Sequence, residues 1–321
     1  MQRRDFTLGA VFAAGAALSS AATPQGVRGQ VQIVVPFPPG GITDTLARVM
    51  GEALSRLWGQ VVVVEDRPGA SGYIAAEYVS KAEPSGRTLL LGTSALLTIN
   101  PHLIKTAFDP GRELVPITTV GTSDVVVVVN PSMPASNLQE LANYVKGKPE
   151  GVSYGSPSSA STQHLTGELL QRQLGVKLVH VAYKGSAPAL NDVIAGHIPM
   201  MIDNIISALP HIRSGRLRAL SVSGTRRSAA LQDVPTFQES GLAGLTTSAW
   251  FPLLGPKGMA ADLVSGIQHD AALVLEQPAV REQLLAQGVD PSGESTAALQ
   301  ARIERDLARW KRVIAESKIM L

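Results

Sequence analysis

The sequence has no cysteine, which excludes disulfides, thiolate zinc sites and cysteine nucleophiles. Aromatic residues make up only 4% of the chain, which argues against a surface on which bases or sugars stack. The formal net charge is +2 over 321 residues, so no strong field attracts nucleic acid or a charged membrane surface. Apolar residues reach 45%, which excludes a disordered chain and indicates an ordinary globular α/β protein.

The sequence also lacks the motifs of several enzyme classes. The Gly-x-Ser-x-Gly turn of many hydrolases is absent, since residues 69–72 and 92–95 both fail its spacing. Neither a Walker phosphate loop nor the Gly-x-Gly-x-x-Gly loop of dinucleotide-binding proteins occurs. The six histidines do not show the paired helical spacing of a metal site. We therefore expect a protein that is not an enzyme and that uses no cofactor and no metal.

The first 22 residues have the order of an export signal. Arg3 and Arg4 form a short basic start, residues 8–18 form an apolar stretch, and small residues at 19–22 offer a cleavage site. The apolar stretch is too short and too rich in alanine to span a bilayer. We predict that residues 1–22 are a signal peptide removed near Ala22 and that the mature protein is periplasmic. The paired arginines fit the twin-arginine route, and the general secretion route stays open.

The length of the chain favours two lobes, because it exceeds the size at which a single hydrophobic core usually stops growing. From residue 31 onward, short β-branched runs alternate with amphipathic stretches, which predicts a mostly parallel sheet covered by helices. The predicted strands are residues 31–35, 61–65, 88–93, 125–129, 152–154, 178–181, 200–202 and 217–221. The predicted helices include residues 46–57, 74–82, 163–173, 188–195 and 299–314.

The sequence predicts two passages of the chain between the lobes. The valines at 125–129 form a buried strand at the first passage, and the apolar run at 250–254 marks the second. Lobe 1 is therefore predicted to comprise residues 30–125 with 249–321, and lobe 2 residues 126–248. Ser136 to Gln139 has the spacing of a capping box and predicts the start of the next helix. Two passages, in place of one linker, imply a hinged pair of lobes around a cleft.

Loops that follow the strands are the candidate ligand-binding segments, because ligands of open α/β sheets collect beyond the carboxyl ends of the strands. The loop after the first strand and the start of the next helix contain Pro39, Gly40, Gly41, Thr43 and Asp44. The glycines allow a close approach of the backbone to a ligand, and the free N–H groups of the helix start favour an anion. We therefore predict an anion site at this loop.

The predicted second lobe supplies a hydroxyl-rich loop at residues 155–162, and another loop at 183–186 also precedes a helix. The remaining candidate binding residues, taken from these loops and from the ends of other strands, are Ser94, Ser156, Ser158, Ser161, Thr162, Tyr183, Gly185 and Asp203. Their hydroxyl and amide donors suit carboxylate oxygens without a cationic side chain. Each loop has a plainer interpretation as turn chemistry. Asp44, His164 and Asp203 could likewise cap or pack against their own helices.

Several longer motifs resemble those of one known family. They are VVPFPPGGITD at residues 34–44, VEDRPGA at 64–70, HVAYKGSAPA at 180–189 and SALPHI at 207–212. Over residues 30–317 the sequence is similar to the substrate-binding receptors of the tripartite tricarboxylate transporter family, also called Bug receptors. Ile42 departs from the family pattern, which commonly has glycine there, and residues 158–160 depart from it as well.

The resemblance implies a type II periplasmic binding-protein fold, with two βα lobes joined by two crossovers around a ligand cleft. It implies capture of a small carboxylate, such as a tricarboxylate, a dicarboxylate, an acidic amino acid or an aromatic acid, and delivery to a two-component membrane permease. In family terms the loops at 39–44 and 156–162 grip the carboxylate, which assigns this role to Gly41, Thr43, Ser156 and Ser161. We expect a monomer that binds no nucleic acid. The alternatives are a periplasmic sensor that docks on a membrane kinase and an enzyme acting on small acids.

Overall fold

The computed structural model describes residues 29–242, 244–317 and 319 of the chain. The predicted signal peptide, residues 1–22, lies outside the described residues. None of the helices formed by the described residues is long and apolar enough to cross a membrane. The described fold begins with the first predicted strand.

One sheet of ten strands runs through the described part of the molecule. Its main path is, in order, β2 (Val62–Asp66), β1 (Val31–Val35), β3 (Thr88–Leu91), β9 (Ser248–Pro256), β4 (Leu114–Val129), β7 (Met200–Asn204), β5 (Val152–Ser156) and β6 (Leu178–Ala182). Two further strands, β8 (Arg218–Val222) and β10 (Asp290–Pro291), each pair with β4. The β1 and β5 strands pair in parallel with both neighbours, whereas β4 and β9 run antiparallel to theirs. The sheet is therefore mixed, with parallel strands toward both ends.

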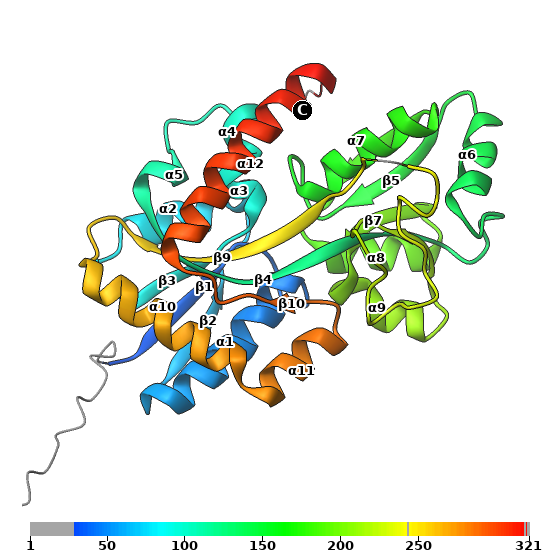
Figure 1. Cartoon of the computed structure of the whole chain (residues 1–321). Helices are drawn as coiled ribbons and strands as arrows, with labels where there is room; N and C mark the ends of the chain where they lie inside the picture. Colours follow the sequence, from blue (N-terminus) through cyan, green and yellow to red (C-terminus); the bar gives the residue numbers. More distant parts are fainter. Residues whose placement is uncertain (1–28, 243, 318, 320–321) are drawn as a thin grey trace, which may run out of the picture.

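The long strands β4 and β9 join two halves of the molecule (Figure 1). Residues 114–124 of β4 pair with β9, and the valines at 125–129 pair with β7 and β8. We call the half that contains β1–β3 lobe 1 and the half that contains β5–β8 lobe 2. The residue boundaries given above for the lobes stay predictions. Because both strands are continuous, any movement of one lobe against the other has to bend them.

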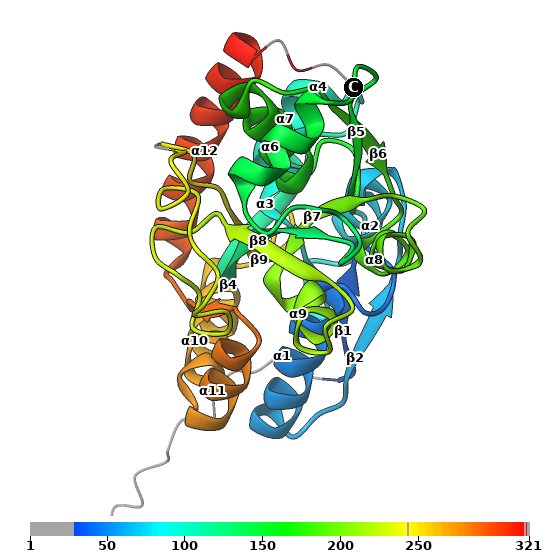
Figure 2. The same cartoon turned by 90° about the vertical axis from the view of Figure 1, so that its right-hand side faces the viewer.

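Helices cover both faces of the sheet in each lobe (Figures 1 and 2). Lobe 1 carries α1 (Ile42–Trp58), α2 (Tyr73–Ser80), α3 (Ser94–Thr98), α4 (Asn100–Leu103), α5 (Pro110–Glu113), α10 (Ala261–Glu276), α11 (Pro278–Ala286) and α12 (Thr296–Ser317). Lobe 2 carries α6 (Leu138–Lys146), α7 (Thr162–Leu174), α8 (Ser186–Ala195) and α9 (Ile205–Arg213). This arrangement, with its mixed sheet and two βα halves, confirms the predicted fold class.

The predicted valine strand is buried on both faces. Successive side chains of a strand point to opposite faces, so the odd-numbered valines of 125–129 lie on one face of the sheet and the even-numbered ones on the other. The odd-numbered ones pack in the apolar cluster that contains α6 and α7, and the even-numbered ones in the cluster of α8 and α9. This explains why the segment is a continuous apolar run and not an alternating one.

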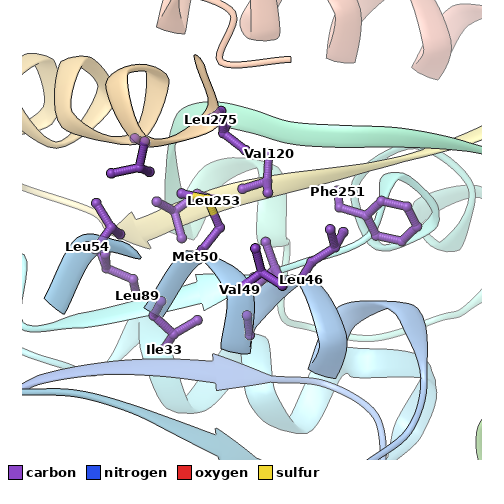
Figure 3. Close-up of a cluster of buried hydrophobic side chains, with 14 of the residues drawn as sticks. Ile33, Leu46, Val49, Met50, Leu54, Leu89, Val120, Phe251, Leu253 and Leu275 are labelled. Carbon is purple, nitrogen blue, oxygen red and sulfur yellow. The ribbon is translucent and has the colours of Figure 1, made fainter. Parts of the chain in front are cut away.

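The largest core of lobe 1 lies between α1 and the sheet (Figure 3). Leu46 and Met50 of α1 pack against Ile33 of β1, Leu89 of β3 and Leu253 of β9. Fully burying a side chain of this size contributes roughly 1.5–3 kcal/mol. The packing fixes the position of α1, and with it the loop that leads into the helix from β1.

A smaller apolar cluster joins the two lobes beside α12. Trp310 of α12 packs in it with Ile99 of lobe 1 and Leu165 of α7 in lobe 2. Nearby, the Arg309 guanidinium donates to the backbone oxygen of Thr246 at 2.7 Å. The last helix therefore touches both lobes, as Figure 1 shows from the course of α12 toward α7.

The predicted capping box at Ser136 was wrong by one residue. The N-cap of α6 is Asn137, whose side chain accepts a hydrogen bond from the Glu140 N–H at 2.9 Å. The Glu140 carboxylate accepts in turn from the Ser136 N–H at 2.7 Å. Asparagine is as good an N-cap as serine, and the acidic residue that completes the box stands three positions after Asn137.

Candidate functional site

Five helices begin around one pocket, two from lobe 1 and three from lobe 2. The pocket and its open mouth together enclose about 540 Å³ of space between atoms. The lining residues from the starts of α1, α3, α7, α8 and α9 are Gly41, Ile42, Thr43, Thr93, Ser94, Ala95, Ser161, Thr162, Gln163, Gly185, Ser186 and Asn204. The first amides of a helix have no partner within it, so the pocket gathers N–H donors from both lobes.

None of the described residues that line this pocket carries a formal charge. The rest of the lining is Phe37, Ser71, Asn100, Pro157, Ser158, Ala249 and Phe251. The hydroxyls of Thr43, Ser158 and Thr162 and the carboxamide of Gln163 make no hydrogen bond with another described residue. An anion in the pocket would therefore be held by neutral donors and by helix dipoles, not by an ion pair.

The β1–α1 loop, residues 36–41, is held by a carboxylate of the helix that follows it. Asp44 Oδ2 accepts a hydrogen bond from the Gly40 N–H at 2.9 Å, and Asp44 Oδ1 pairs with Arg48 Nε at 2.7 Å. Gly40 has a φ of +85°, a conformation that glycine adopts without strain. The N-cap residue Gly41 has no side chain to occupy the first amides of α1. These amides remain available to a ligand.

The β5–α7 loop, residues 157–161, is held by hydroxyl groups. The backbone oxygen of Ser158 accepts hydrogen bonds from Ser156 Oγ at 2.9 Å and from Ser161 Oγ at 2.8 Å. Ser161 Oγ also accepts from the His164 N–H at 3.1 Å and so caps α7. Both hydroxyls therefore donate their protons to the Ser158 oxygen and have none left for a ligand. The donors that this side offers to a ligand are therefore the Thr162 and Gln163 amides and the free hydroxyls of Ser158 and Thr162.

Two histidines stack beneath the β5–α7 loop. The rings of His164 in α7 and His180 in β6 are parallel, with centroids 3.7 Å apart. Burial lowers the pKa of His164 to about 4. Burial, and then the neighbouring His164, lowers the pKa of His180 to about 3. Both rings are therefore neutral near pH 7.

Asp203 lies behind the pocket and is fully buried. Its Oδ1 accepts hydrogen bonds from Ser186 Oγ at 2.7 Å and from the Asn204 N–H at 2.8 Å. Burial raises the pKa of Asp203 to about 7, although both hydrogen bonds act in the opposite direction. The carboxyl orients Ser186 and Asn204, and these two residues line the pocket.

The two lobes touch at the mouth of the pocket. Ser71 Oγ of lobe 1 donates to the backbone oxygen of Ser159 in lobe 2 at 3.2 Å. Gly185 in lobe 2 has a φ of +114°, and a Cβ atom at this position would lie 3.1 Å from Pro38 Cδ in lobe 1. Glycine is thus required at 185 by its backbone angle and by the close approach. The structure has the lobes in contact over the pocket.

The structure brings together many of the residues predicted to bind the ligand. Those that line the pocket are Gly41, Thr43, Ser94, Ser158, Ser161, Thr162 and Gly185. Tyr183 lines a neighbouring surface hollow and donates its hydroxyl proton to Asp192 at 2.7 Å. The predicted residues that line neither space are Pro39, Gly40, Asp44, Ser156 and Asp203.

Other lining residues were not among those predicted. Gln163 and Asn204 could have been found, because each stands at the start of a helix that follows a predicted strand. Ser71 reaches the pocket from a 3-10 turn, Asn100 from the first turn of α4 and Phe251 from β9. No local pattern identifies such residues, since Phe251 is placed by the pairing of β9 with β3 and β4, and Asn100 bonds to the Ser71 backbone oxygen across the fold.

Comparison with known proteins places the chain among solute receptors. A family model described as tripartite tricarboxylate transporter family receptor matches residues 46–319. Protein BugT of Bordetella pertussis is 35% identical over 289 residues, which is 89% of each chain. The solved structure of R. palustris Rpa4515 with adipate has 33% identity and a TM-score of 0.89, over 91% of this chain and 98% of that one. MatC (Rpa3494) from Rhodopseudomonas palustris with bound malate has 29% identity and a TM-score of 0.83, over 89% and 98% of the two chains.

Proposed function

This chain belongs to the tripartite tricarboxylate transporter family of receptors, and from that premise we propose that it binds a small carboxylate in the pocket between its lobes. The observation that carries the proposal is the meeting of five helix starts around a pocket whose described lining has no charged side chain. The structures described with adipate and with malate support it, because both acids carry carboxylates. The protein acts as an exported receptor and not as an enzyme.

The carboxylate is bound from both sides of the pocket. On the lobe 1 side, the amides at the start of α1 and the Thr43 hydroxyl donate to it. On the lobe 2 side, the Thr162 and Gln163 amides and the Thr162 hydroxyl donate. A helix start stabilises an anion by about 0.3–1 kcal/mol at a surface and up to about 2 kcal/mol when partly buried. Several such donors, with exclusion of water, account for micromolar affinity, which corresponds to about −8 kcal/mol.

The lining also limits the class of acid. A ligand ammonium would find no carboxylate among the described lining residues, so amino acids are disfavoured. The carboxamide oxygens of Asn100 and Asn204 are buried without a partner among the described residues. An unpaired buried acceptor costs about 1–3 kcal/mol, which a ligand hydroxyl can offset. We therefore propose a carboxylic acid without an amine and with a hydroxyl group.

Transport follows from closure of the lobes. The two lobes, residues 30–125 with 249–321 and residues 126–248, close over the acid by bending β4 and β9. The closed form then delivers the acid to a two-component membrane permease. The same closed form could dock on a membrane kinase, and capture of the partner from membranes in the presence of the acid distinguishes the two.

The experiment is calorimetric titration of the protein with malate, succinate and aspartate, which differ only in a hydroxyl, a hydrogen and an ammonium group at one carbon. Adipate is added as a longer diacid. We expect malate to bind most tightly and aspartate least. If aspartate bound most tightly, the restriction to acids without an amine would be wrong. If no carboxylate bound in a wider screen, or if the bound acid were chemically converted, the receptor function itself would be wrong.

A further inference from the structure

The stacked histidines contact the β5–α7 loop and the last residue of β5, which leads into it. The Ala160 N–H donates to His164 Nδ1 at 3.2 Å, and His180 Nε2 lies 2.6 Å from Ser156 Oγ. Ala160 has a φ of +53°, which is uncommon for a residue with a Cβ atom and is maintained only where the surroundings impose it. Both contacts reach the segment that presents Ser158 to the pocket.

Matching each donor around the two imidazoles to one acceptor shows which ring nitrogen carries the proton. His164 Nδ1 accepts from an amide, so its proton sits on Nε2, which faces Glu168 Oε1 at 3.8 Å. Ser156 has one hydroxyl proton, and this proton goes to the Ser158 oxygen. His180 Nε2 must therefore be the donor to Ser156 Oγ. Each ring carries its proton on Nε2, and every bond around the loop has one donor and one acceptor.

We propose that His164 and His180 are positioning residues that hold the β5–α7 loop in the shape that binds the ligand. The inference rests on the proposed function, because it assigns the pair a role at that same pocket. His164 fixes the strained Ala160, and His180 fixes Ser156, which in turn holds the Ser158 oxygen. Ser158, Ser161 and Thr162 then face the pocket in a fixed arrangement.

The arrangement depends on the rings being neutral. A second proton on His164 would sit on Nδ1 and face the Ala160 N–H. Two donors would then face each other, and this hydrogen bond would be lost. The titratable groups in contact with the pair are Glu168, at 3.8 Å from His164, and Tyr154, whose ring centroid is 5.0 Å from that of His180. The single hydroxyl proton of Tyr154 is shared between the His164 backbone oxygen and Glu168 Oε1, at 3.0 and 3.2 Å. Burial raises the pKa of Tyr154, so this neighbour stays neutral as well.

The test compares a disruptive and a conservative substitution at each histidine. Asparagine at 164 can place an oxygen where Nδ1 stands, and glutamine at 180 can place a nitrogen where Nε2 stands. His164→Leu and His180→Leu remove these atoms. We expect the leucine variants to raise the Kd for malate about tenfold and to speed amide hydrogen exchange at residues 158–162. His164→Asn and His180→Gln should stay within about threefold of the wild-type Kd, with slow exchange.

Two readouts do not require a ligand. Nitrogen-15 spectra of the imidazoles should show protons on Nε2 of both rings and neutral rings at pH 6. The leucine variants should change exchange in the loop without changing it in α10, which does not touch the loop. An Nδ1 proton, a charged ring at pH 6, or unchanged exchange at 158–162 in both leucine variants would overturn the inference. If these readouts hold while no acid binds the wild type, the receptor function fails and the role of the pair in loop structure stands.

Discussion

The two loops that face each other across the pocket are held in different ways. A charged residue holds the β1–α1 loop, since Asp44 binds Gly40 with one oxygen and pairs with Arg48 through the other. The Arg48 side chain is 56% exposed. Neutral and largely buried groups hold the β5–α7 loop, namely the hydroxyls of Ser156 and Ser161 and the two imidazoles.

The difference predicts how each loop responds to change. The ion pair joins the buried Asp44 carboxylate, which is 8% exposed, to an arginine that reaches into solvent, so water and salt screen it in part and its contribution is of order 1 kcal/mol. A buried network of neutral groups depends on every member, because one lost partner leaves a buried donor or acceptor unpaired. The β5–α7 loop should therefore be the sensitive side of the pocket and the β1–α1 loop the tolerant side.

Gly185 lies between the two loops, and its substitution should have the largest effect. Its N–H donates to the Pro157 oxygen of one loop at 2.8 Å, and its Cα approaches Pro38 of the other. In Gly185→Ala the backbone angle alone costs about 1–3 kcal/mol, and the methyl group presses on Pro38. We expect affinity for the acid to fall more than about tenfold by calorimetry. Gly196→Ala, at the other end of α8, is the control, with a φ of +80° and only the Asn130 side chain near a Cβ atom there, at 3.9 Å. Equal affinity in both variants would contradict closure at this contact.

Low pH should reduce the stability of the folded protein through protonation of His164. Comparison of the wild type with His164→Asn isolates this contribution. The folded protein takes up a proton on His164 only near pH 4, whereas the unfolded chain takes it up near pH 6.5. The stability contribution of the neutral ring is therefore complete above about pH 6.5 and is lost as the pH falls toward 4. Unfolding in urea should show the stability advantage of the wild type over His164→Asn falling by about 1.2 kcal/mol from pH 6 to pH 5.

The carboxyls of Asp124 and Asp203 change stability with pH in the direction opposite to His164. The quantity to measure is therefore the difference in unfolding free energy between the wild type and His164→Asn at each pH. Burial raises the pKa of Asp124 to about 6 and that of Asp203 to about 7. Both groups stabilise the folded state as the pH falls, because the unfolded chain releases these protons down to about pH 4. They are present in both proteins and cancel from the comparison. A difference in stability that stays constant with pH would show that His164 is not neutral in the folded state.

Much of the sheet was predictable from sequence, because its parallel strands are short β-branched runs between amphipathic helices. The predicted strand at 31–35 coincides with β1, and the predicted helix at 163–173 lies within α7. The first part of β4, residues 114–124, was not predicted. It contains Pro116, Gly121 and Asp124, which are poor strand residues, and its pairing with β9 shifts register twice. Only tertiary contacts make this segment a strand.

The pocket was predictable at the level of loops and less so at the level of side chains. Glycine and hydroxyl residues before helices pointed to the correct segments, because free helix amides are a property of position. The sequence could not separate residues that face the pocket from residues that bond within their own loop. Ser156 and Thr162 have similar hydroxyls, yet Ser156 bonds within the loop and Thr162 lines the pocket.

Removing one free hydroxyl from each side of the pocket should have a moderate effect on binding. Thr43→Ala and Thr162→Ala each lose one donor, and we expect about fivefold to tenfold weaker binding of malate. Thermal stability should stay close to the wild-type value, because neither hydroxyl bonds to another described residue. Thr225→Ala is the matched control, because this threonine is exposed, lies outside the pocket lining and makes no side-chain hydrogen bond with another described residue. If both variants bound malate with unchanged affinity, these two helix starts would not be part of the binding site.

The smallest effect on ligand affinity is expected from substitution of Asp44. This substitution tests directly whether the β1–α1 loop tolerates change. Asp44→Asn keeps an oxygen for the Gly40 N–H and loses the ion pair with the exposed Arg48 and the negative charge in the first turn of α1. Stability should fall by about 1 kcal/mol in chemical unfolding. Malate affinity should be unchanged, because the carboxylate does not line the pocket. If Asp44→Asn weakened binding as much as Thr43→Ala, the charge at 44 would contribute to ligand binding and the contrast between the two loops would be wrong.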